Sequence, residues 1–239
     1  MAVLADLAEW SRAPLSGTVP RIETMPAVPP LSRRERASLC DLLDDLGPDA
    51  PTLCEGWTTC DLAAHLVLRE GSPLAMPGLL VPQLEQLTDR GMARLKERVS
   101  YPSLVQRVRQ GPPRLSPMRP GKVERMANTI EYFVHHEDVR RAQPDWQPRS
   151  FDDRDQDRLW SRLVILAKGL ARSSSVGVEL VRTDAPAVRR IKSGEPTLVV
   201  RGVPTELTLF AYGRGAQADV DLEGDDAART GFAHREFGI

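Results

Sequence analysis

The N-terminal part of the chain carries apolar residues at the spacing of α-helices. In the first such segment, leucines recur at intervals of three and four residues, at Leu39, Leu42, Leu43 and Leu46. This period places them on one helix face. Ser32 and Glu35 fit a capping box, in which each side chain satisfies a backbone donor at the helix start. Because Gly47-Pro48 breaks the pattern, the sequence predicts a helix over residues 32–46.

The same periodicity predicts further helices as far as residue 172. Asp61 stands in the first turn of one of them, where the helix dipole favours a carboxylate. Gly71 and Pro144 mark two of the helix ends. The predicted segments are residues 58–71, 79–99, 101–110, 122–142 and 152–172. The apolar stripe of the segment 122–142 is formed by Met126, Ile130, Phe133 and Val134.

The pattern changes after residue 173, where apolar residues alternate with small or polar ones. The alternating positions are Val176, Val178, Leu180, Val220 and Leu222. A period of two predicts half-buried strands there, and the apolar run 197–200 predicts another. Residues 204–212 form a helical stretch between the last two strands. Helices that come first and strands that follow indicate an α+β fold in two units, not an alternating β-α-β sheet.

Prolines divide the chain into three predicted parts. Residues 13–30 hold five prolines and few apolar residues that could form a core, so this segment is expected to be extended. We predict a proline-rich extension over residues 1–30, a helical unit over 31–173 and a small α+β domain over 174–239.

The composition is that of a globular protein, with 239 residues of which 41% are hydrophobic and 27% charged. Lys and Arg number 32 and Asp and Glu 33, so the net charge of −1 gives no overall field that would attract nucleic acid or an anionic membrane. No apolar run approaches the roughly 20 residues of a membrane helix, and the N-terminus lacks a signal pattern. We therefore expect a cytoplasmic protein that binds neither nucleic acid nor membrane.

The cysteines suggest neither a disulfide framework nor a thiolate zinc site. The chain has three, Cys40, Cys54 and Cys60, and no Cys-x-x-Cys motif. Each is expected to be a small, buried or half-buried thiol.

The histidines offer the clearest candidate chemistry. Glu131 and His135 are four residues apart in a predicted helix, so both side chains project from one face and can reach one cation. His65, on another predicted helix, supplies a third ligand if the two helices face each other. Two histidines and one glutamate, with a position left open, are a common catalytic zinc arrangement, and the cores of helix bundles are a usual place for such sites.

These residues also have structural interpretations. A Glu/His pair four residues apart is frequent on solvated helix faces, and a single histidine such as His65 is more often a packed or capping residue. His136 is an alternative ligand if the helix phase is shifted, and otherwise it is expected to face solvent, as is His234.

Asp138 lies on the same predicted helix face as His135, three residues away. From there its carboxylate either accepts a hydrogen bond from the ring nitrogen of His135 that does not bind the metal or forms a surface ion pair with Arg140 or Arg141. The sequence leaves both interpretations open.

Three segments carry a family resemblance. They are GWTTCDLAAHL at residues 56–66, EYFVHHEDVRR at residues 131–141, with its Glu-x-x-x-His pattern, and a C-terminal group at residues 200–214 and 220–225. In this order they resemble the DinB-like, mycothiol-dependent maleylpyruvate isomerase superfamily, and the chain is similar to an actinobacterial branch of metal-binding proteins. The resemblance runs from about residue 31 to 228.

The resemblance implies an N-terminal DinB-like four-helix bundle followed by a small sterol-carrier-like α+β domain. It implies a divalent metal, usually zinc, held by His65, Glu131 and His135. Arg214 matches a Gly-Arg pair of the C-terminal domain, from which an arginine faces the active site in relatives. The short C-terminal domain and the proline-rich loop at residues 112–120 depart from the isomerase, so the resemblance supports the metal site and the fold better than the reaction.

The implied chemistry uses the metal to hold a thiol as its nucleophilic thiolate. Mycothiol or another low-molecular-weight thiol would add to a small electrophilic substrate. Retention of the adduct gives a thiol transferase, whereas addition, rotation and elimination give a cis–trans isomerase. Arg69 or Arg214 would hold a carboxylate of the substrate. Alternatively, Arg69 forms a surface ion pair with Glu70 or another acid.

Two other functions remain open at this point. A zinc hydrolase would activate water and would need Glu137 or Asp138 as general base. A non-catalytic binding module would hold a structural metal, closed by a fourth ligand such as His136 or Cys60, and would bind an apolar ligand in its C-terminal half. We expect a monomer or a homodimer.

Overall fold

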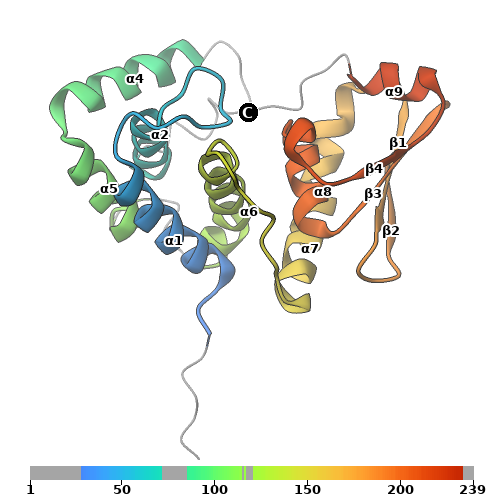
Figure 1. The fold of residues 1–239 in the computed structure, drawn as a ribbon, viewed down its shortest axis with the longest axis horizontal. Coiled ribbons are helices and arrows are strands. Elements are labelled where there is room, and N and C mark those ends of the chain that lie inside the picture. The colour runs from blue at the N-terminus through green and yellow to red at the C-terminus, as the bar shows by residue number, and fades with distance from the viewer. Residues whose placement is uncertain (1–27, 72–84, 115, 117–120, 234–239) are drawn as a thin grey trace, which may run out of the picture.

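The computed structural model describes residues 28–71, 85–114, 116 and 121–233. Figure 1 shows a group of helices on one side and a sheet with its own helices on the other. The chain therefore has the predicted α+β class. Residues 1–27 of the predicted extension and His234 lie outside the described residues.

The first group of helices is built around buried leucines. It consists of α1 (Leu31–Leu46), α2 (Thr59–Gly71), α4 (Glu85–Arg98), α5 (Tyr101–Gln110) and α6 (Gly121–Arg140). Helix α1 packs on α5 and α6, and α2 packs on α4 and α5. Leu39 and Leu43 of the predicted stripe are fully buried in one hydrophobic cluster with Leu62 and Leu66 of α2. The periodicity thus located both the helices and the face that each one buries.

The predicted capping box at the start of α1 is wrong. The helix begins at Leu31 after Pro30, and no side chain caps it. Glu35 instead accepts hydrogen bonds from Arg149 and pairs with His136. A buried carboxylate gains more from charged partners than from a backbone N–H, so the tertiary contact prevails over the local motif.

The sheet has four strands in the order β2-β1-β3-β4. The strands are β1 (Gly177–Arg182), β2 (Val188–Lys192), β3 (Thr197–Gly202) and β4 (Asp221–Glu223). Strands β1 and β3 run parallel, and the two outer pairs are antiparallel. Val200 pairs with both Leu180 and Leu222, so the predicted alternating positions form a row across the sheet.

Strand β2 was not predicted. It lies at the edge of the sheet and exposes Val188, Arg189 and Arg190, and only Ile191 is buried. An edge strand with one buried residue carries no apolar alternation, and its charged side chains protect the edge from pairing with another chain.

Three helices accompany the sheet: α7 (Asp153–Leu170), α8 (Pro204–Ala211) and α9 (Asp226–Ala233). Helix α9 was not predicted either. Helix α7 packs on α8, and it also contacts β2 and α6. Two short 3₁₀ turns, Ala171–Ser173 and Gly215–Gln217, follow α7 and α8. The boundary between residues 173 and 174 stays a prediction.

Helix α6 contributes to both hydrophobic cores. Tyr132 and Val139 belong to the cluster of the first helices, whereas Ile130, Phe133 and Val134 belong to the cluster beneath the sheet. From Asn128 to Val139 every residue of this helix is buried. Its polar side chains in this stretch therefore have only one another and neighbouring elements as partners.

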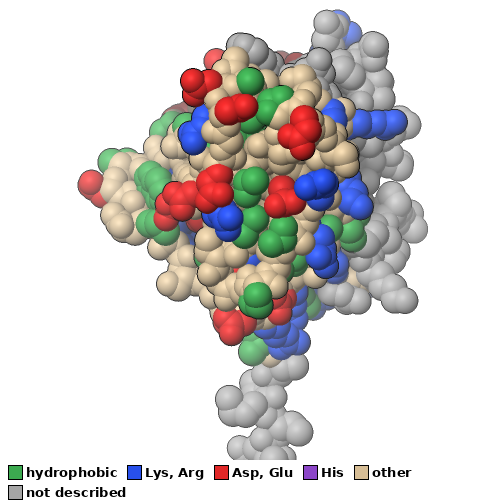
Figure 2. All heavy atoms as spheres, turned by 90° about the vertical axis from the view of Figure 1, so that its right-hand side faces the viewer, with side chains coloured by type: hydrophobic (Ala, Val, Ile, Leu, Met, Phe, Trp, Pro, Cys, Tyr) green, Lys and Arg blue, Asp and Glu red, His purple; other side chains and the backbone are tan. Residues whose placement is uncertain are grey.

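The outer face of the molecule on the sheet side is mixed in character. Figure 2 shows acidic, basic and apolar side chains interspersed over it. Opposite charges pair across strands there, as Arg201 does with Glu223. None of the helices in the described part of the chain has the length and apolarity that crossing a membrane requires.

Candidate metal centre

Two helices bring the three candidate ligands together. His65 lies on α2, and Glu131 and His135 lie one turn apart on α6. Because α6 is covered on both sides, its Glu/His pair does not face solvent, and all three side chains are buried. The structural alternative of a solvated pair is therefore wrong.

The ligand atoms of the three side chains converge. The Nε2 atoms of His65 and His135 lie 3.3 and 3.4 Å from the same oxygen of Glu131. The ligand atoms of all three residues lie within 4.8 Å of one another. Two imidazoles and one carboxylate are a donor set that suits zinc and similar divalent ions. The arrangement is able to hold such an ion, and binding itself stays a prediction.

The buried position decides how these groups are charged. Burial lowers the pKa of His65, since it disfavours the charged imidazolium. Burial also opposes the charge of Glu131, but Arg69 and the two histidines together hold the pKa of this carboxyl well below its ordinary value. For His135, burial is outweighed by hydrogen bonds, first that with Asp138, which raise the pKa well above its ordinary value.

Arg69 approaches the cluster from α2. Its Nε lies 3.0 Å from Oε1 of Glu131, and its Nη1 donates to Oδ1 of Asn128 at 2.7 Å. Because Arg69 is buried, the alternative of a surface ion pair is wrong. The guanidinium places positive charge directly beside the candidate ligands.

Asp138 contacts the imidazole ring of His135 and fixes its orientation. Its Oδ2 lies 2.9 Å from Nδ1 of His135, on the side of the ring away from Nε2. Arg140 and Arg141 both pair with Glu137 instead, so the proposed surface ion pair of Asp138 with either arginine is wrong.

Arg214 reaches this site through Asp138. Its Nε and Nη2 donate to the two carboxylate oxygens of Asp138 at 2.7 and 2.8 Å, and its Nη1 donates to the carbonyl of Tyr212. These bonds help to hold the pKa of Asp138 at about 2 although burial opposes its charge. Arg214 thus lies close to the candidate centre but is separated from the ligands by Asp138.

Cys54 is a neighbour that the sequence analysis missed. Its Sγ lies 3.3 Å from Oδ2 of Asp138, 3.4 Å from Nη2 of Arg214 and 4.0 Å from Nδ1 of His135. It reaches the site from the loop between α1 and α2, which a backbone hydrogen bond from Leu53 to Asp138 ties to α6. No periodicity reveals a loop residue of this kind. With His135 and Asp138 it forms a second group with metal-ligand spacing, in which Arg214 already donates to both oxygens of Asp138.

The other candidate residues lie apart from the cluster. His136 was expected to face solvent, but it is buried and pairs with Glu35 at 2.8 Å, because α6 is enclosed. Cys60 is half-buried at the start of α2. Neither belongs to a group with metal-ligand spacing among the described residues.

Comparison with solved structures identifies the fold. Two crystal structures match, one of the mycothiol-dependent maleylpyruvate isomerase and one of a histidine-to-alanine mutant of that enzyme. For each, the identity is 15%, the match covers 81% of this chain and 90% of the other, and the TM-score is 0.53. No family model matches the chain, and no curated protein matches it significantly in sequence. The likeness to the isomerase structures is therefore one of fold.

Proposed function

We propose that this chain is a metal- and thiol-dependent enzyme, an isomerase or a transferase, that acts on a small electrophilic substrate. The observation that carries the proposal is the buried convergence of His65, Glu131 and His135, whose ligand atoms lie within 4.8 Å of one another. The fold shared with a mycothiol-dependent isomerase supports mycothiol or a related thiol as cosubstrate.

The three converging residues hold the metal, which we propose to be zinc or another divalent ion. Bound there, the ion favours the thiolate form of a thiol at neutral pH. Three protein ligands are the number that catalytic zinc sites use, whereas structural sites use four. His65, Glu131 and His135 supply these three, which favours a catalytic site over a structural one.

Asp138 and Arg214 act as positioning residues. Asp138 accepts a hydrogen bond from the Nδ1–H of His135 at 2.9 Å, so the Nε2 atom is presented to the cluster. Arg214 engages both oxygens of Asp138 and keeps that carboxylate in place and ionised. Since Nε, Nη1 and Nη2 of Arg214 all donate within the protein, this arginine acts through Asp138 rather than on a substrate.

Arg69 is the better candidate for contact with a substrate. Its guanidinium lies beside Glu131, within the cluster itself. A planar guanidinium binds a carboxylate through paired hydrogen bonds, so a substrate that carries a carboxylate next to its reactive carbon would be oriented there.

The finer layout follows the family resemblance. We propose that the first helices correspond to a DinB-like bundle over residues 31–173 and that the sheet with α8 and α9 corresponds to a sterol-carrier-like domain over residues 174–239. We further propose that the enzyme is a monomer or homodimer that works in the cytoplasm without nucleic-acid or membrane partners.

The alternative functions have less support. A hydrolase would need Glu137 or Asp138 as general base, but Arg140, Arg141 and Arg149 occupy Glu137. Asp138 is likewise taken by His135 and Arg214. A structural metal would need a fourth ligand, and His136, one of the two proposed, pairs with Glu35 instead.

The first test is the metal content of the purified protein, determined by elemental mass spectrometry. We expect about one zinc per chain in the wild type and a loss of metal in His65→Ala, Glu131→Gln and His135→Ala. His136→Gln is the matched control, because it changes the adjacent histidine, which pairs with Glu35, and should leave the metal content unchanged. Wild-type protein that binds no divalent metal would overturn the proposal.

The second test concerns the thiol. Metal-loaded protein is incubated with small unsaturated carboxylic acids, with and without mycothiol, and the products are followed by mass spectrometry and NMR. We expect turnover only with the thiol, and its loss in Arg69→Gln. Equal turnover without any thiol would overturn the thiol dependence of the proposal.

A further inference from the structure

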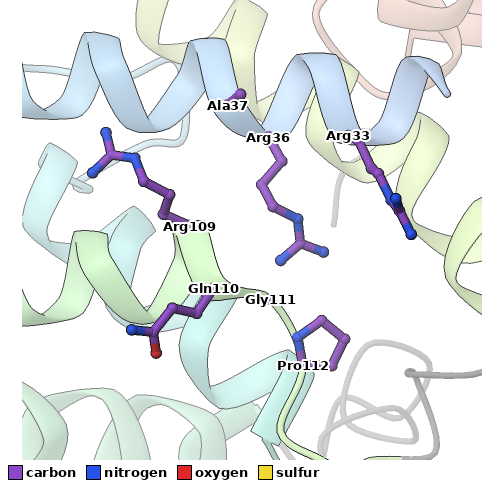
Figure 3. Close-up of a pocket in the computed structure, with 7 residues that line it drawn as sticks. All are labelled: Arg33, Arg36, Ala37, Arg109, Gln110, Gly111 and Pro112. Atoms are coloured by element: carbon purple, nitrogen blue, oxygen red, sulfur yellow. The ribbon is translucent and has the colours of Figure 1, made fainter. Parts of the chain in front are cut away.

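A pocket outside the metal centre is lined by arginines. It lies between the first turns of α1 and the C-terminal end of α5 and has a volume of about 350 Å³. Figure 3 shows Arg33 and Arg36 extending from α1 toward the loop at Gly111 and Pro112, with Arg109 on the α5 side. Three arginines line it, and Arg33 is the one whose charge no carboxylate of the described residues pairs.

Arg36 forms a fixed part of this pocket. It is buried, donates two hydrogen bonds to the carboxylate of Glu70 and one to the carbonyl of Val108, and lies 4.3 Å over the ring of Tyr132. A guanidinium held by so many contacts keeps its orientation before any ligand arrives, which reduces the entropy that binding costs.

Gly111 allows the chain to pass close to this guanidinium. Its φ is +77°, which favours glycine, and a Cβ at this position would lie 3.0 Å from Nη1 of Arg36. A larger residue would push against Arg36 and narrow the pocket. The backbone of the loop thus reaches the pocket only because residue 111 has no side chain.

The other two arginines are available to a ligand. Arg33 is exposed, and its guanidinium makes no hydrogen bond or ion pair with any part of the chain that the structure describes. Arg109 pairs with Asp41 and Asp44, but both carboxylates are exposed, so solvent screens these pairs and they are easily exchanged.

We infer that this pocket binds a small organic anion, through a phosphate or carboxylate group that Arg33 contacts beside the fixed guanidinium of Arg36. Arginine is suited to this because its planar fork matches the oxygens of both groups. The volume of about 350 Å³ exceeds what a bare ion needs and lies within the range of about 300–1,000 Å³ that is usual for small-molecule sites.

The pocket is distinct from the metal centre, although buried polar contacts connect the two. Arg36 binds Glu70, Glu70 accepts from Asn128, and Asn128 accepts from Arg69, which contacts Glu131. Three side chains therefore stand between the pocket and the candidate ligand Glu131. A ligand can bind in this pocket whether or not the protein catalyses the proposed reaction.

The test is isothermal titration calorimetry of the metal-loaded protein with inorganic phosphate and with succinate, at constant ionic strength maintained with chloride. We expect saturable binding of at least one probe, and the tighter one identifies the group that the ligand carries. In Arg33→Gln we expect binding about tenfold weaker, the loss of one charge-assisted hydrogen bond. Arg189→Gln, which removes an exposed arginine of β2, is the matched control and should bind like the wild type.

Two results would overturn the inference. One is the absence of saturable binding of both probes to the wild type. The other is equal affinity in the wild type and Arg33→Gln, since the anion would then bind elsewhere, for example at the metal. Because Arg33 is exposed and its guanidinium has no partner in the described part of the chain, thermal unfolding of the variant should match the wild type, and a loss of binding then reports on the pocket alone.

Discussion

At the scale of single residues, metal binding at the candidate centre depends on which ring nitrogen of His135 carries a proton. His135 can offer Nε2 to a metal only if its remaining proton is on Nδ1, and Asp138 accepts at that atom. Burial opposes the charge of Asp138, but His135 and Arg214 hold its pKa at about 2, so the carboxylate is ionised at neutral pH. Arg214 therefore influences the metal site without contacting a ligand atom of the cluster.

The substitution Asp138→Asn tests this role. The amide keeps the shape but loses the charge that fixes His135, so we expect metal affinity to fall by about 10–100-fold. Competition with a coloured chelator measures it. Asp152→Asn is the control, because Asp152 caps α7 and asparagine caps a helix equally well. Unchanged affinity in Asp138→Asn would contradict the positioning role.

At the scale of secondary-structure elements, a glycine with positive φ after a helix is not equivalent to a glycine that belongs to the helix. Gly111 follows α5 with a φ of +77°, and its backbone N–H bonds back to carbonyls of the last turn. Gly169 belongs to the last turn of α7, and a Cβ there would meet nothing within 4 Å. Only the first position requires glycine.

Two alanine substitutions should therefore change the free energy of unfolding in opposite directions. We expect Gly111→Ala to destabilise the protein by at least about 1–2 kcal/mol, the cost of left-handed backbone for a residue with a Cβ. We expect Gly169→Ala to stabilise it by up to about 1 kcal/mol, because alanine favours the helix. Urea unfolding measures both, and equal changes would refute this interpretation of the two positions.

The elements that the sequence analysis missed share a physical reason. Strand β2 and helix α9 are short and bury few residues, so few apolar positions mark them in the sequence. The capping box of α1 failed for a different reason, because Glu35 has buried cations as partners in the folded state. Local patterns therefore predict best the elements that bury a full face.

At the scale of the whole molecule, buried ion pairs join α6 to the α+β part. Arg141 follows α6 and donates through Nε to Glu137 and through both terminal nitrogens to Glu206 of α8. The side chains of all three residues are almost fully buried. Arg214 makes a second link of this kind to Asp138. The candidate metal site thus depends on how the two parts pack together.

We expect Arg141→Met to destabilise the protein by about 3–5 kcal/mol, because the buried carboxylate of Glu206 loses its cationic partner and that of Glu137 keeps only Arg140 and Arg149. Glu206→Gln should cost less, since the amide oxygen can still accept from Arg141. A double-mutant cycle by chemical denaturation should show coupling between the two positions. Additive effects would indicate that the pair does not connect the two parts energetically.

Acid should weaken the fold through its buried carboxylates. Burial opposes the charge of Glu35, but His136 and Arg149 outweigh it and lower the pKa below the ordinary 4.5. A lowered pKa in the folded state means that ionised Glu35 stabilises the protein above about pH 4.5 and that this stability is lost as the pH falls further.

Urea unfolding at pH 7 and pH 3.5 tests this contribution. Glu35→Gln should lose less stability between the two pH values than the wild type, because one titrating group has been removed. An equal loss in both proteins would show that Glu35 does not contribute to the acid sensitivity.

The sequence by itself determined the α+β class, the main helices with their buried faces, and the set of residues His65, Glu131 and His135. Periodicity and the fixed four-residue offset on a helix are local properties, so they can be read without coordinates. Whether α2, which carries His65, faces α6, which carries Glu131 and His135, is not a local property, and only the tertiary structure decided it.

The same limit applies to the residues around the candidate ligands. The loop position of Cys54, the pairing of Asp138 with Arg214 and the burial of His136 all follow from enclosing α6 between two cores. A buried polar group must find partners wherever the packing provides them. Because those partners come from distant parts of the chain, the sequence could name the candidate ligands but not the contacts that orient them.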